Sequence, residues 1–332
     1  MNSFDISLQR FPQNSPYVDY IHDDPVFDPA RHLALTEPEN LLSLSELGYG
    51  EEIDGTSPTD IAATSAFRIL SQEGAELMLH VCQQLEQFTT SNARIAKNCR
   101  GGTYRSKFLR DFSLSQDVAE HLSSIMKTQL VPHAMGHHLS HLNYAPPELG
   151  EDVDKWHYDT LQVDYVMFVT DLKKVSGGEF QYFLGTRDEM QALYDAKETL
   201  PAERVVAPQI PGPGYAVLMQ GNYVVHQAKG LKEKGERITL VNGYNYADKN
   251  TPDYTALKQL VLADPESLAT AEYIRHVALR CAGNLEEVIN QPHFETDKSV
   301  QLQKLYDARR ELEIGIAQLE DDSVEEMKHF GS

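Results

Sequence analysis

The stretch that decides the fold is Trp156-His157-Tyr158-Asp159, followed directly by the strand-like run Thr160-Leu-Gln-Val-Asp-Tyr-Val-Met-Phe-Val-Thr170. Residues two apart on a β-strand point to the same face, so a strand here presents the imidazole of His157 and the carboxylate of Asp159 side by side. Both groups are common metal ligands, and His226, far along the chain, is the candidate for a second imidazole. The pattern therefore predicts a metal site built from separate segments.

The His-x-acid spacing needs its context to become informative. With 13 histidines and 50 acidic residues among 332, about two such pairs arise by chance. Only the pair at 157–159 begins a strand-like run, because one other pair lies in a proline-rich leader and the third follows Pro292 in a charged tail. Two histidines and one carboxylate on one side of an ion leave its other positions open, as in non-haem iron(II) oxygenases. The three pairs are His22-x-Asp24, His157-x-Asp159 and His293-x-Glu295.

Further strand and turn signals follow the first run. Gly221-Asn222 predicts a tight turn into a return strand that ends at His226. In the last strand, Arg237 and Thr239 share a face. The predicted elements are strands at 180–184, 215–219, 223–226 and 237–242, and a helix at about 187–199.

The block from about 131 to 245 resembles the iron(II)- and 2-oxoglutarate-dependent dioxygenase superfamily. The resemblance is carried by Trp-His-x-Asp at 156–159, Gly-Gly-Glu at 177–179, Pro-Gly at 213–214, His226, and Arg-x-Thr at 237–239. It implies an α+β fold with a double-stranded β-helix (jelly-roll, cupin-like) core flanked by N- and C-terminal helices. It also implies that His157, Asp159 and His226 bind iron(II), and that Arg237, Thr239 and Asn143 hold 2-oxoglutarate.

The arginine has a physical reason to be there. 2-Oxoglutarate chelates a metal through its 2-oxo and adjacent carboxylate groups, so its other carboxylate lies deeper in the protein, where it needs a partner. A guanidinium offers a fixed two-donor fork, and the Thr239 hydroxyl offers another hydrogen bond. The competing interpretation is that Arg237 is a surface residue beside Glu233 and Glu236, with His157 and His226 as ordinary core or surface histidines.

The resemblance implies oxidation of an unactivated C–H bond with iron(II), 2-oxoglutarate and O2. Asp159 stands where related halogenases have glycine, which favours hydroxylation, desaturation or ring closure. A second, weaker resemblance, in Arg-Gly-Gly-Thr-Tyr-Arg at 100–105, Leu-Asn-Tyr at 142–144 and Trp-His-Tyr-Asp, is to members that act on free amino acids or related small metabolites. Two alternatives stay open: a jelly-roll protein that binds another divalent metal without 2-oxoglutarate, and a non-catalytic ligand-binding barrel.

Two further segments supply candidate substrate residues. The basic loop with Arg100 and Arg105 is either a clamp for a substrate carboxylate or a turn with solvated charges. A first core strand through 137–144 would place His137, His141 and Asn143 on one face, where the histidines could meet co-substrate or substrate. The rival interpretation makes His137 and His141 themselves the metal site.

The amino-acid composition limits the kinds of binding partner that we expect. A hydrophobic share of 41%, a charged share of 24% and a net charge of −21 describe a globular chain whose surface repels nucleic acid and anionic lipid. The three cysteines, Cys82, Cys99 and Cys281, lack metal-site spacing and fit a reducing compartment. With no signal peptide pattern and no apolar run near 18 residues, we expect a cytoplasmic protein with a small-molecule substrate, and neither nucleic-acid nor membrane partners.

We expect one compact catalytic unit with three segments. Residues 1–130 form a leader, extended to about 56, and helices that pack on the core; 131–248 form the core; 249–332 form a helical extension. Ser57-Pro-Thr-Asp60 predicts a helix start, and a second helix is predicted at 116–127. The last helix packs on the domain or on a twin subunit, forming a homodimer. Its apolar repeat is Leu302, Leu305, Leu312, Ile316 and Leu319.

Overall fold

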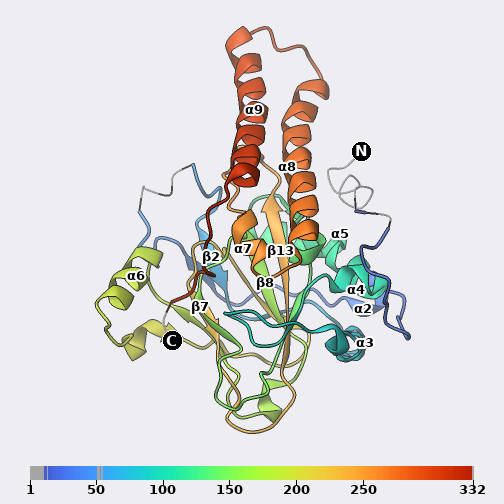
Figure 1. The fold of residues 1–332 in the computed structure, drawn as a ribbon, viewed down its shortest axis with the longest axis vertical. Coiled ribbons are helices and arrows are strands. Elements are labelled where there is room, and N and C mark those ends of the chain that lie inside the picture. Colours follow the sequence, from blue (N-terminus) through green and yellow to red (C-terminus); the bar gives the residue numbers. More distant parts are fainter. Residues whose placement is uncertain (1–10, 13, 51–52, 54, 331–332) are drawn as a thin grey trace.

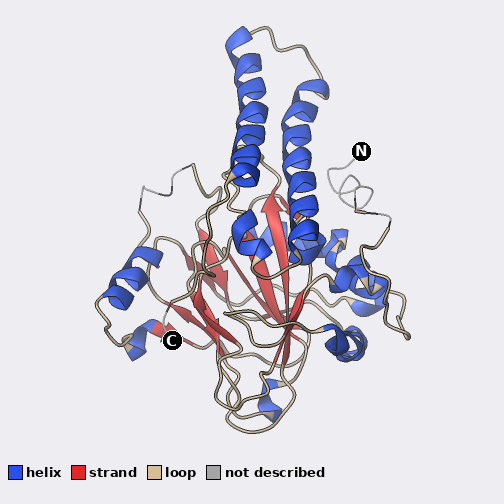
Figure 2. Cartoon of the chain, in the orientation of Figure 1, coloured by secondary structure: helices blue, strands red, loops and turns tan. Residues whose placement is uncertain are grey.

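Two antiparallel β-sheets form the centre of the protein in a computed structural model, which describes residues 11–12, 14–50, 53 and 55–330. Helices lie around the sheets, and a long helical hairpin protrudes from one end (Figures 1 and 2). The nine-stranded sheet has the order β1-β2-β11-β8-β13-β6-β4, with β3 paired to β11 and β5 to β13. The four-stranded sheet has the order β10-β9-β12-β7.

The strands are short except for β13, which pairs with three neighbours. Their bounds are β1 Leu41–Ser43, β2 Ile61–Thr64, β3 Phe67–Arg68, β4 Asn98–Cys99, β5 Leu130–Pro132, β6 His141–Tyr144, β7 Asp154–His157, β8 Val163–Phe168, β9 Phe180–Phe183, β10 Val205–Val206, β11 Tyr215–Met219, β12 His226–Ala228 and β13 Ile238–Tyr246.

The helices flank this framework. Their bounds are α2 Pro29–His32, α3 Gln72–Leu85, α4 Lys107–Ser113, α5 Gln116–Met126, α6 Arg187–Asp195, α7 Leu257–Val261, α8 Glu266–Ile289 and α9 Lys298–Glu320. Short 3-10 turns are η2 Glu86–Phe88, η3 Gly102–Tyr104, η4 Gly136–His138, η5 Leu172–Lys174 and η6 Ala202–Arg204.

Strand β8 explains why residues 165–168 of the deciding stretch are all apolar. Val166 and Phe168 pack with Phe180 of the smaller sheet. Tyr165 and Met167 point to the other side and join a core with the helical residues of α3, α4 and α5. Because both faces of the larger sheet are covered, a strand in its middle favours apolar side chains on both of its faces, and in β8 only Asp164 is an exception.

The sequence-based helix start at Ser57 is wrong. The Ser57 hydroxyl bonds Thr59 O and Gln220 Oε1, and the chain enters strand β2, whose four residues are all buried. Strand β2 pairs with β11 through Ala63 and Met219, so sheet pairing overrides the local capping signal. The helix begins instead after Ser71, whose hydroxyl accepts from Gly74 N.

Other predicted elements are confirmed more closely. The helix expected at 116–127 is α5, the one expected at about 187–199 is α6, and the strand at 215–219 is β11. The predicted leader contains α2 and β1, and its residues 1–10, 13, 51–52 and 54 lie outside the described part of the chain. Strands β2 and β4, from the segment before 130, pair with core strands β11 and β6.

Three details near the predicted site differ from expectation. Residues 221–223 do not form a hairpin, because β11 and β12 belong to different sheets and the turn carries the chain between them. His137 lies in η4, outside strand β6, so it does not share a strand face with His141 and Asn143. Asp159 likewise lies two residues beyond the end of β7.

Helices α8 and α9 form the antiparallel hairpin that stands above the sheets (Figure 1). Its two arms are joined by a buried ion pair between Arg280 and Glu311, with a Nε–Oε2 distance of 2.5 Å. After α9 the chain runs back to the smaller sheet, where Phe330 N donates to Trp156 O at 2.6 Å. No helix in the described residues is both long and apolar enough to cross a membrane.

Glu272 fastens the base of this hairpin to the body of the protein. Its buried carboxylate accepts from the Tyr104 hydroxyl, from Gly136 N at 3.0 Å, and from His137 N at 3.3 Å and Nδ1 at 2.9 Å. Burial alone would raise the pKa of Glu272, but the hydrogen bonds from His137 and Tyr104 bring it below its ordinary value. The charged form is therefore the one that the fold stabilises.

We predict that Glu272→Ala lowers the free energy of unfolding by about 3 kcal/mol at pH 7, because several buried donors lose their acceptor. Urea denaturation measures the loss, and Glu266→Ala, in the exposed first turn of the same helix, should cost less than about 1 kcal/mol. Since the folded pKa is depressed, the stabilisation is present above the ordinary carboxyl pKa of roughly 4.3 and disappears as the pH falls. Equal stability of the two variants would contradict this role.

Candidate metal centre and co-substrate cavity

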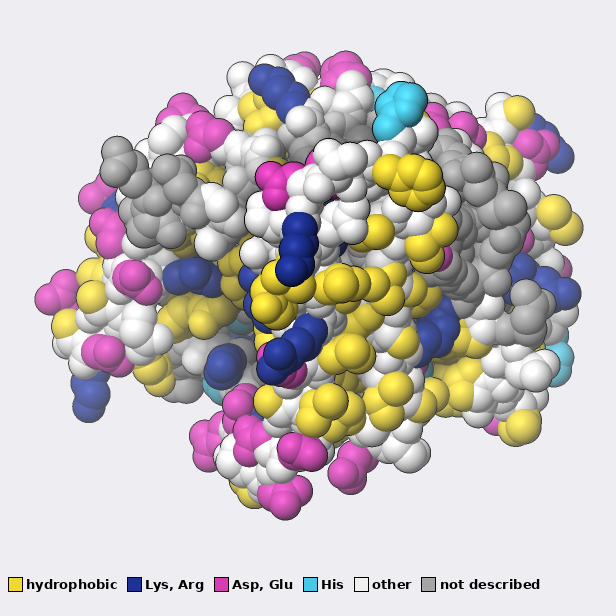
Figure 3. All heavy atoms as spheres, turned by 90° about the horizontal axis from the view of Figure 1, so that it is seen from above, with side chains coloured by type: hydrophobic (Ala, Val, Ile, Leu, Met, Phe, Trp, Pro, Cys, Tyr) yellow, Lys and Arg dark blue, Asp and Glu magenta, His cyan; other side chains and the backbone are white. Residues whose placement is uncertain are grey.

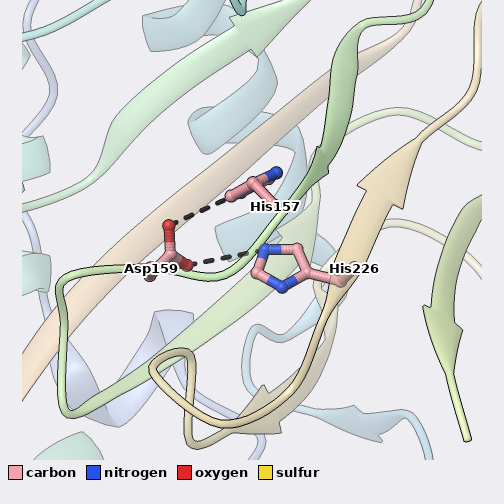
Figure 4. Close-up of side chains that lie close together, drawn as sticks. All are labelled: His157, Asp159 and His226. Carbon is pink, nitrogen blue, oxygen red and sulfur yellow. Dashed lines mark ion pairs between the residues drawn. The ribbon is translucent and has the colours of Figure 1, made fainter. Parts of the chain in front are cut away.

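Three side chains from separate segments converge between the sheets. His157 ends β7, His226 begins β12, and these two residues are partners in the pairing of the strands, with ring centroids 4.2 Å apart. Asp159 reaches the same point from the loop after β7, where its N–H donates to Gly221 O at 2.8 Å. One ligand atom from each residue lies within 4.8 Å of the others (Figure 4). Among the described residues this is the one group of histidine, cysteine and acidic side chains close enough to share an ion.

Backbone carbonyls fix the tautomers of both histidines. Nδ1 of His157 lies 2.6 Å from Lys155 O, and Nδ1 of His226 lies 2.9 Å from Val224 O. A carbonyl only accepts, so each Nδ1 carries hydrogen and each Nε2 keeps a lone pair directed to the centre. Each Nε2 lies 3.5 Å from an oxygen of Asp159. Ligands about 2.1 Å from one ion and at right angles are about 3 Å apart, so these residues fit a divalent metal.

Protonation also favours metal binding. Burial lowers the pKa of His226 to about 3, so its imidazole is neutral near pH 7. Burial alone would raise the pKa of Asp159, but His157 and His226 outweigh it and hold the pKa below its ordinary value. Neutral imidazole and ionised carboxylate are the forms that coordinate metals.

A buried guanidinium lies in the same cavity. Arg237 is 1% exposed, and it donates from Nε to Gly178 O at 3.0 Å and from Nη1 to Thr239 Oγ1 at 3.0 Å. Its Nη2 has no hydrogen-bond partner, and neither has Oδ1 of Asn143. Asn143 is the pairing partner of Thr239, so strands β6 and β13 place both side chains in the cavity.

Burial lowers the pKa of Arg237 to about 10, so the group remains charged near pH 7. A buried charge with an unpaired donor is costly unless an anion completes it. These residues therefore fit the far carboxylate of a metal-chelating dicarboxylate such as 2-oxoglutarate.

The position of Arg237 explains why the sequence has Gly-Gly-Glu at 177–179. Gly178 has φ +79°, and a Cβ there would lie 2.9 Å from Leu231 Cδ2 and 3.4 Å from Arg237 Cδ. Only glycine allows the turn after β8 to pass over the arginine and offer the Gly178 carbonyl to it.

A larger cavity of about 290 Å³ opens beside Asp159. Asp159 is the only acidic residue among its described lining residues, and Arg100 and His141, two of the sequence candidates, are part of its wall. The Arg100 Nε pairs with both carboxylate oxygens of Asp264, at 2.8 and 2.9 Å, while its Nη2 is buried without a partner. Sequence reasoning missed the other basic lining residues, Arg94, Arg187 and Lys328.

These missed residues carry no local signal. The Arg187 guanidinium lies 5.0 Å above the Tyr158 ring and 5.1 Å above the Tyr223 ring, and its Nη1 donates to Asn222 O at 2.8 Å. It begins helix α6, which the sequence predicted as a helix without any link to the site. Lys328 reaches the cavity from the last segment of the chain, and only the tertiary fold brings it there.

The remaining candidates lie elsewhere. The Arg105 guanidinium stacks on Tyr17 at 3.9 Å and on Phe88 at 4.1 Å, and donates to Asp19 O. His137 bonds the Tyr17 hydroxyl at 2.8 Å in addition to Glu272. Neither residue lines the two cavities at the triad, whereas His141 lines both. Burial lowers the pKa of His141 to about 3, and its Nδ1 has no partner.

No protein-family model matches the chain, and no curated protein matches it. Solved structures do resemble it. Among them are the non-haem alpha-ketoglutarate-dependent epimerase SnoN and carbocyclase SnoK from nogalamycin biosynthesis. HygX from Streptomyces hygroscopicus, with nickel and 2-oxoglutarate bound, is 11% identical, with 62% of this chain and 87% of that chain covered and a TM-score of 0.41. EctD from S. alaskensis with bound Fe is 13% identical, with 68% of this chain and 83% of that chain covered and a TM-score of 0.42.

A third neighbour is the nickel complex of the non-haem monooxygenase ThoJ, at 12% identity, with 80% of this chain and 98% of that chain covered and a TM-score of 0.42. At these TM-scores the likeness is weak and decides neither the substrate nor the site residues. The assignment of the site therefore rests on the side chains that line the cavity.

We predict that His226→Ala weakens binding of Co²⁺ or Fe²⁺ by at least about 100-fold, because one of three ligands is lost. Anaerobic titration calorimetry measures the affinity. His141→Ala is the matched control, because this buried histidine lines the cavity without belonging to the triad. If His141→Ala abolished binding and His226→Ala did not, the metal would belong to the histidines of the 137–141 segment.

Proposed function

We propose that this protein is an iron(II)- and 2-oxoglutarate-dependent oxygenase that oxidises an unactivated C–H bond of a small molecule. One observation carries the proposal. The triad His157, Asp159 and His226 and the buried, incompletely paired guanidinium of Arg237 line a single cavity. A metal site explains the triad, and a bound dicarboxylate explains the arginine.

The order of the strands supports a jelly-roll core. From β6 to β9 the chain alternates between the larger and the smaller sheet, and after the short edge strand β10 it alternates again from β11 to β13. Within the larger sheet the neighbours are β11-β8-β13-β6, and within the smaller sheet β10-β9-β12-β7. This interleaving of eight strands supports a double-stranded β-helix with the triad between its two sheets.

Each residue then has a defined task. His157, Asp159 and His226 hold the iron from one side, so its remaining positions face the cavity. When bound, iron(II) supplies the redox chemistry by which O2 and 2-oxoglutarate yield succinate, CO2 and one oxygen atom for the substrate. Arg237 and Thr239 bind the far carboxylate of 2-oxoglutarate, and Asn143 orients the same molecule. Their burial excludes water from the reacting side.

The larger cavity supports a substrate that carries a carboxylate, such as a free amino acid or a related metabolite. Arg100, Arg187 and Lys328 give its wall positive charge in a chain of net charge −21. We propose that Arg100 Nη2 and Arg187 bind this carboxylate and that His141, which lines both cavities, contacts the substrate near the iron. The reaction is a hydroxylation, or a desaturation or ring closure at the same centre. Three buried free cysteines are consistent with a cytoplasmic enzyme.

We predict that Arg237→Ala raises the Kd for 2-oxoglutarate at least about 100-fold, because a buried carboxylate loses its charged partner. Titration calorimetry on the Co²⁺-loaded protein measures it, and the same experiment shows that the metal is retained. Thr239→Val should raise this Kd only about 5–10-fold, because one neutral hydrogen bond is lost. Unchanged 2-oxoglutarate affinity in Arg237→Ala would instead favour a metalloprotein that does not use this co-substrate.

We predict that the iron-loaded protein with ascorbate releases succinate from 2-oxoglutarate slowly alone and faster with members of a panel of amino acids. Mass spectrometry of the panel shows the added oxygen or lost hydrogens. For the best substrate, Arg187→Ala should raise KM about 10–100-fold through loss of a charged contact. Arg204→Ala, whose guanidinium lies over Phe183 away from the cavity, serves as the control. Absence of any succinate would favour a non-catalytic binding protein.

A further inference from the structure

Helix α9 presents its apolar side away from helix α8. The apolar repeat Leu302, Leu305, Leu312, Ile316 and Leu319 is 37–53% exposed. The side that faces α8 is made of small or charged residues, where Ala308 O lies 3.5 Å from Cys281 Sγ and a Cβ at Gly315 would lie 2.7 Å from Val277. The contact within the hairpin therefore leaves the apolar repeat of α9 uncovered.

The exposed repeat has the spacing of a coiled-coil seam. Arg309 fills its only gap, so the positions 302, 305, 309, 312, 316 and 319 alternate steps of three and four. Residues spaced in this way form one straight row that a second helix can cover. We name these six residues the α9 row.

Helix α8 adds to the same surface. Val277 and Cys281 of this helix face α9. At about 100° per residue, the exposed apolar residues Ile274, Leu285 and Ile289 lie about a quarter turn around the helix axis from them. The α9 row is likewise rotated by about a quarter turn around the axis of α9 from the residues of that helix that contact α8. Because the two helices are antiparallel, these rotations fall on the same side of the hairpin. Seen from above, apolar side chains gather near the middle of the molecule (Figure 3).

The α9 row matches itself when a second copy is placed antiparallel. With the twofold axis between Arg310 and Glu311, Leu302 faces Leu319 and Leu305 faces Ile316 of the other copy. Arg309 then faces Leu312, with its guanidinium held aside by Glu313 of its own helix at 2.7 Å. A single polar residue in such a seam fixes the register, since other alignments would bury it worse.

Charge supports the same orientation. Within α9, residues 298–310 contain four basic and one acidic side chain, whereas residues 311–320 contain three acidic and no basic ones, of which Glu311 is paired with Arg280. Antiparallel pairing places the basic half of each helix beside the acidic half of the other, and parallel pairing places like charges together. A partner with an unrelated sequence would have to reproduce both the spacing and this charge order.

We propose that two copies of this protein associate through their α8–α9 hairpins, with the α9 helices antiparallel and residue 305 opposite residue 316. The 23 residues of α9 span about 35 Å, and two helices side by side are about 20 Å wide. Roughly 700 Å² per copy is then covered, close to the 800 Å² or so of a stable interface. This dimer does not depend on the proposed catalytic function.

The test measures mass in solution by sedimentation velocity between 1 and 100 µM. The wild-type protein should sediment as a species with twice the 37.4 kDa mass of one chain. Leu305→Lys should weaken association about 100-fold or more, because a lysine is buried opposite Ile316 twice per dimer. Adding Ile316→Glu to it should restore the dimer, since the two new charges meet only in the antiparallel register.

Ile314→Lys is the matched control, because Ile314 is 48% exposed on the same helix but lies outside the α9 row. It should leave the dimer unchanged, and circular dichroism should show equal helix content in all variants. A monomeric wild-type chain at 100 µM overturns the proposal, as does a dimer that Leu305→Lys does not disturb. Failure of the double variant to reassociate overturns the antiparallel register and points to a parallel pair or a different partner.

Discussion

The register between β7 and β12 is the constraint on which the site depends. It sets His157 directly against His226, and a slip of one residue would turn an imidazole out of the space between the sheets. The turn before β12 is equally restricted, since a Cβ at Gly221 would lie 2.9 Å from Asp159 Oδ2. Strand pairing and one glycine therefore bring all three side chains of the proposed metal site together through the fold itself. Such preorganisation removes the cost of ordering them on binding.

The second constraint is electrostatic. The chain carries 21 more acidic than basic residues, yet guanidinium groups line both cavities beside the triad. Arg237 donates to two protein oxygens and keeps one donor unpaired at 1% exposure, so the folded protein retains a charge that only a ligand completes. The cavities beside the triad therefore offer guanidinium groups to an anionic ligand, although the chain as a whole is acidic.

Prediction from sequence succeeded where one residue type or one strong period controls the local structure. The strand at 215–219 and the helices α5 and α6 belong to this group. The convergence of His157, Asp159 and His226 was expected from the resemblance to a known superfamily, because no local pattern brings His226 to the other two residues. Prediction failed where tertiary pairing decides: Ser57 looked like a helix cap, but its segment is drawn into a strand beside β11. His137 and Arg105 matched a simple alternation or charge pattern, yet they contact Tyr17. Arg187 and Lys328 reach the larger cavity through segments distant in sequence, which no local pattern reveals.

After α9 the chain returns to the smaller sheet and so connects the helical hairpin to the region of the triad. Residues 321–330 leave the hairpin, contribute Met327 and Lys328 to the wall of the larger cavity, and end on Trp156, the neighbour of His157. This strap therefore forms part of the wall of the larger cavity and also pairs, through Phe330, with the strand that carries His157. It links the end of the helical hairpin, by the chain itself and a final hydrogen bond, to the neighbour of His157 in the smaller sheet.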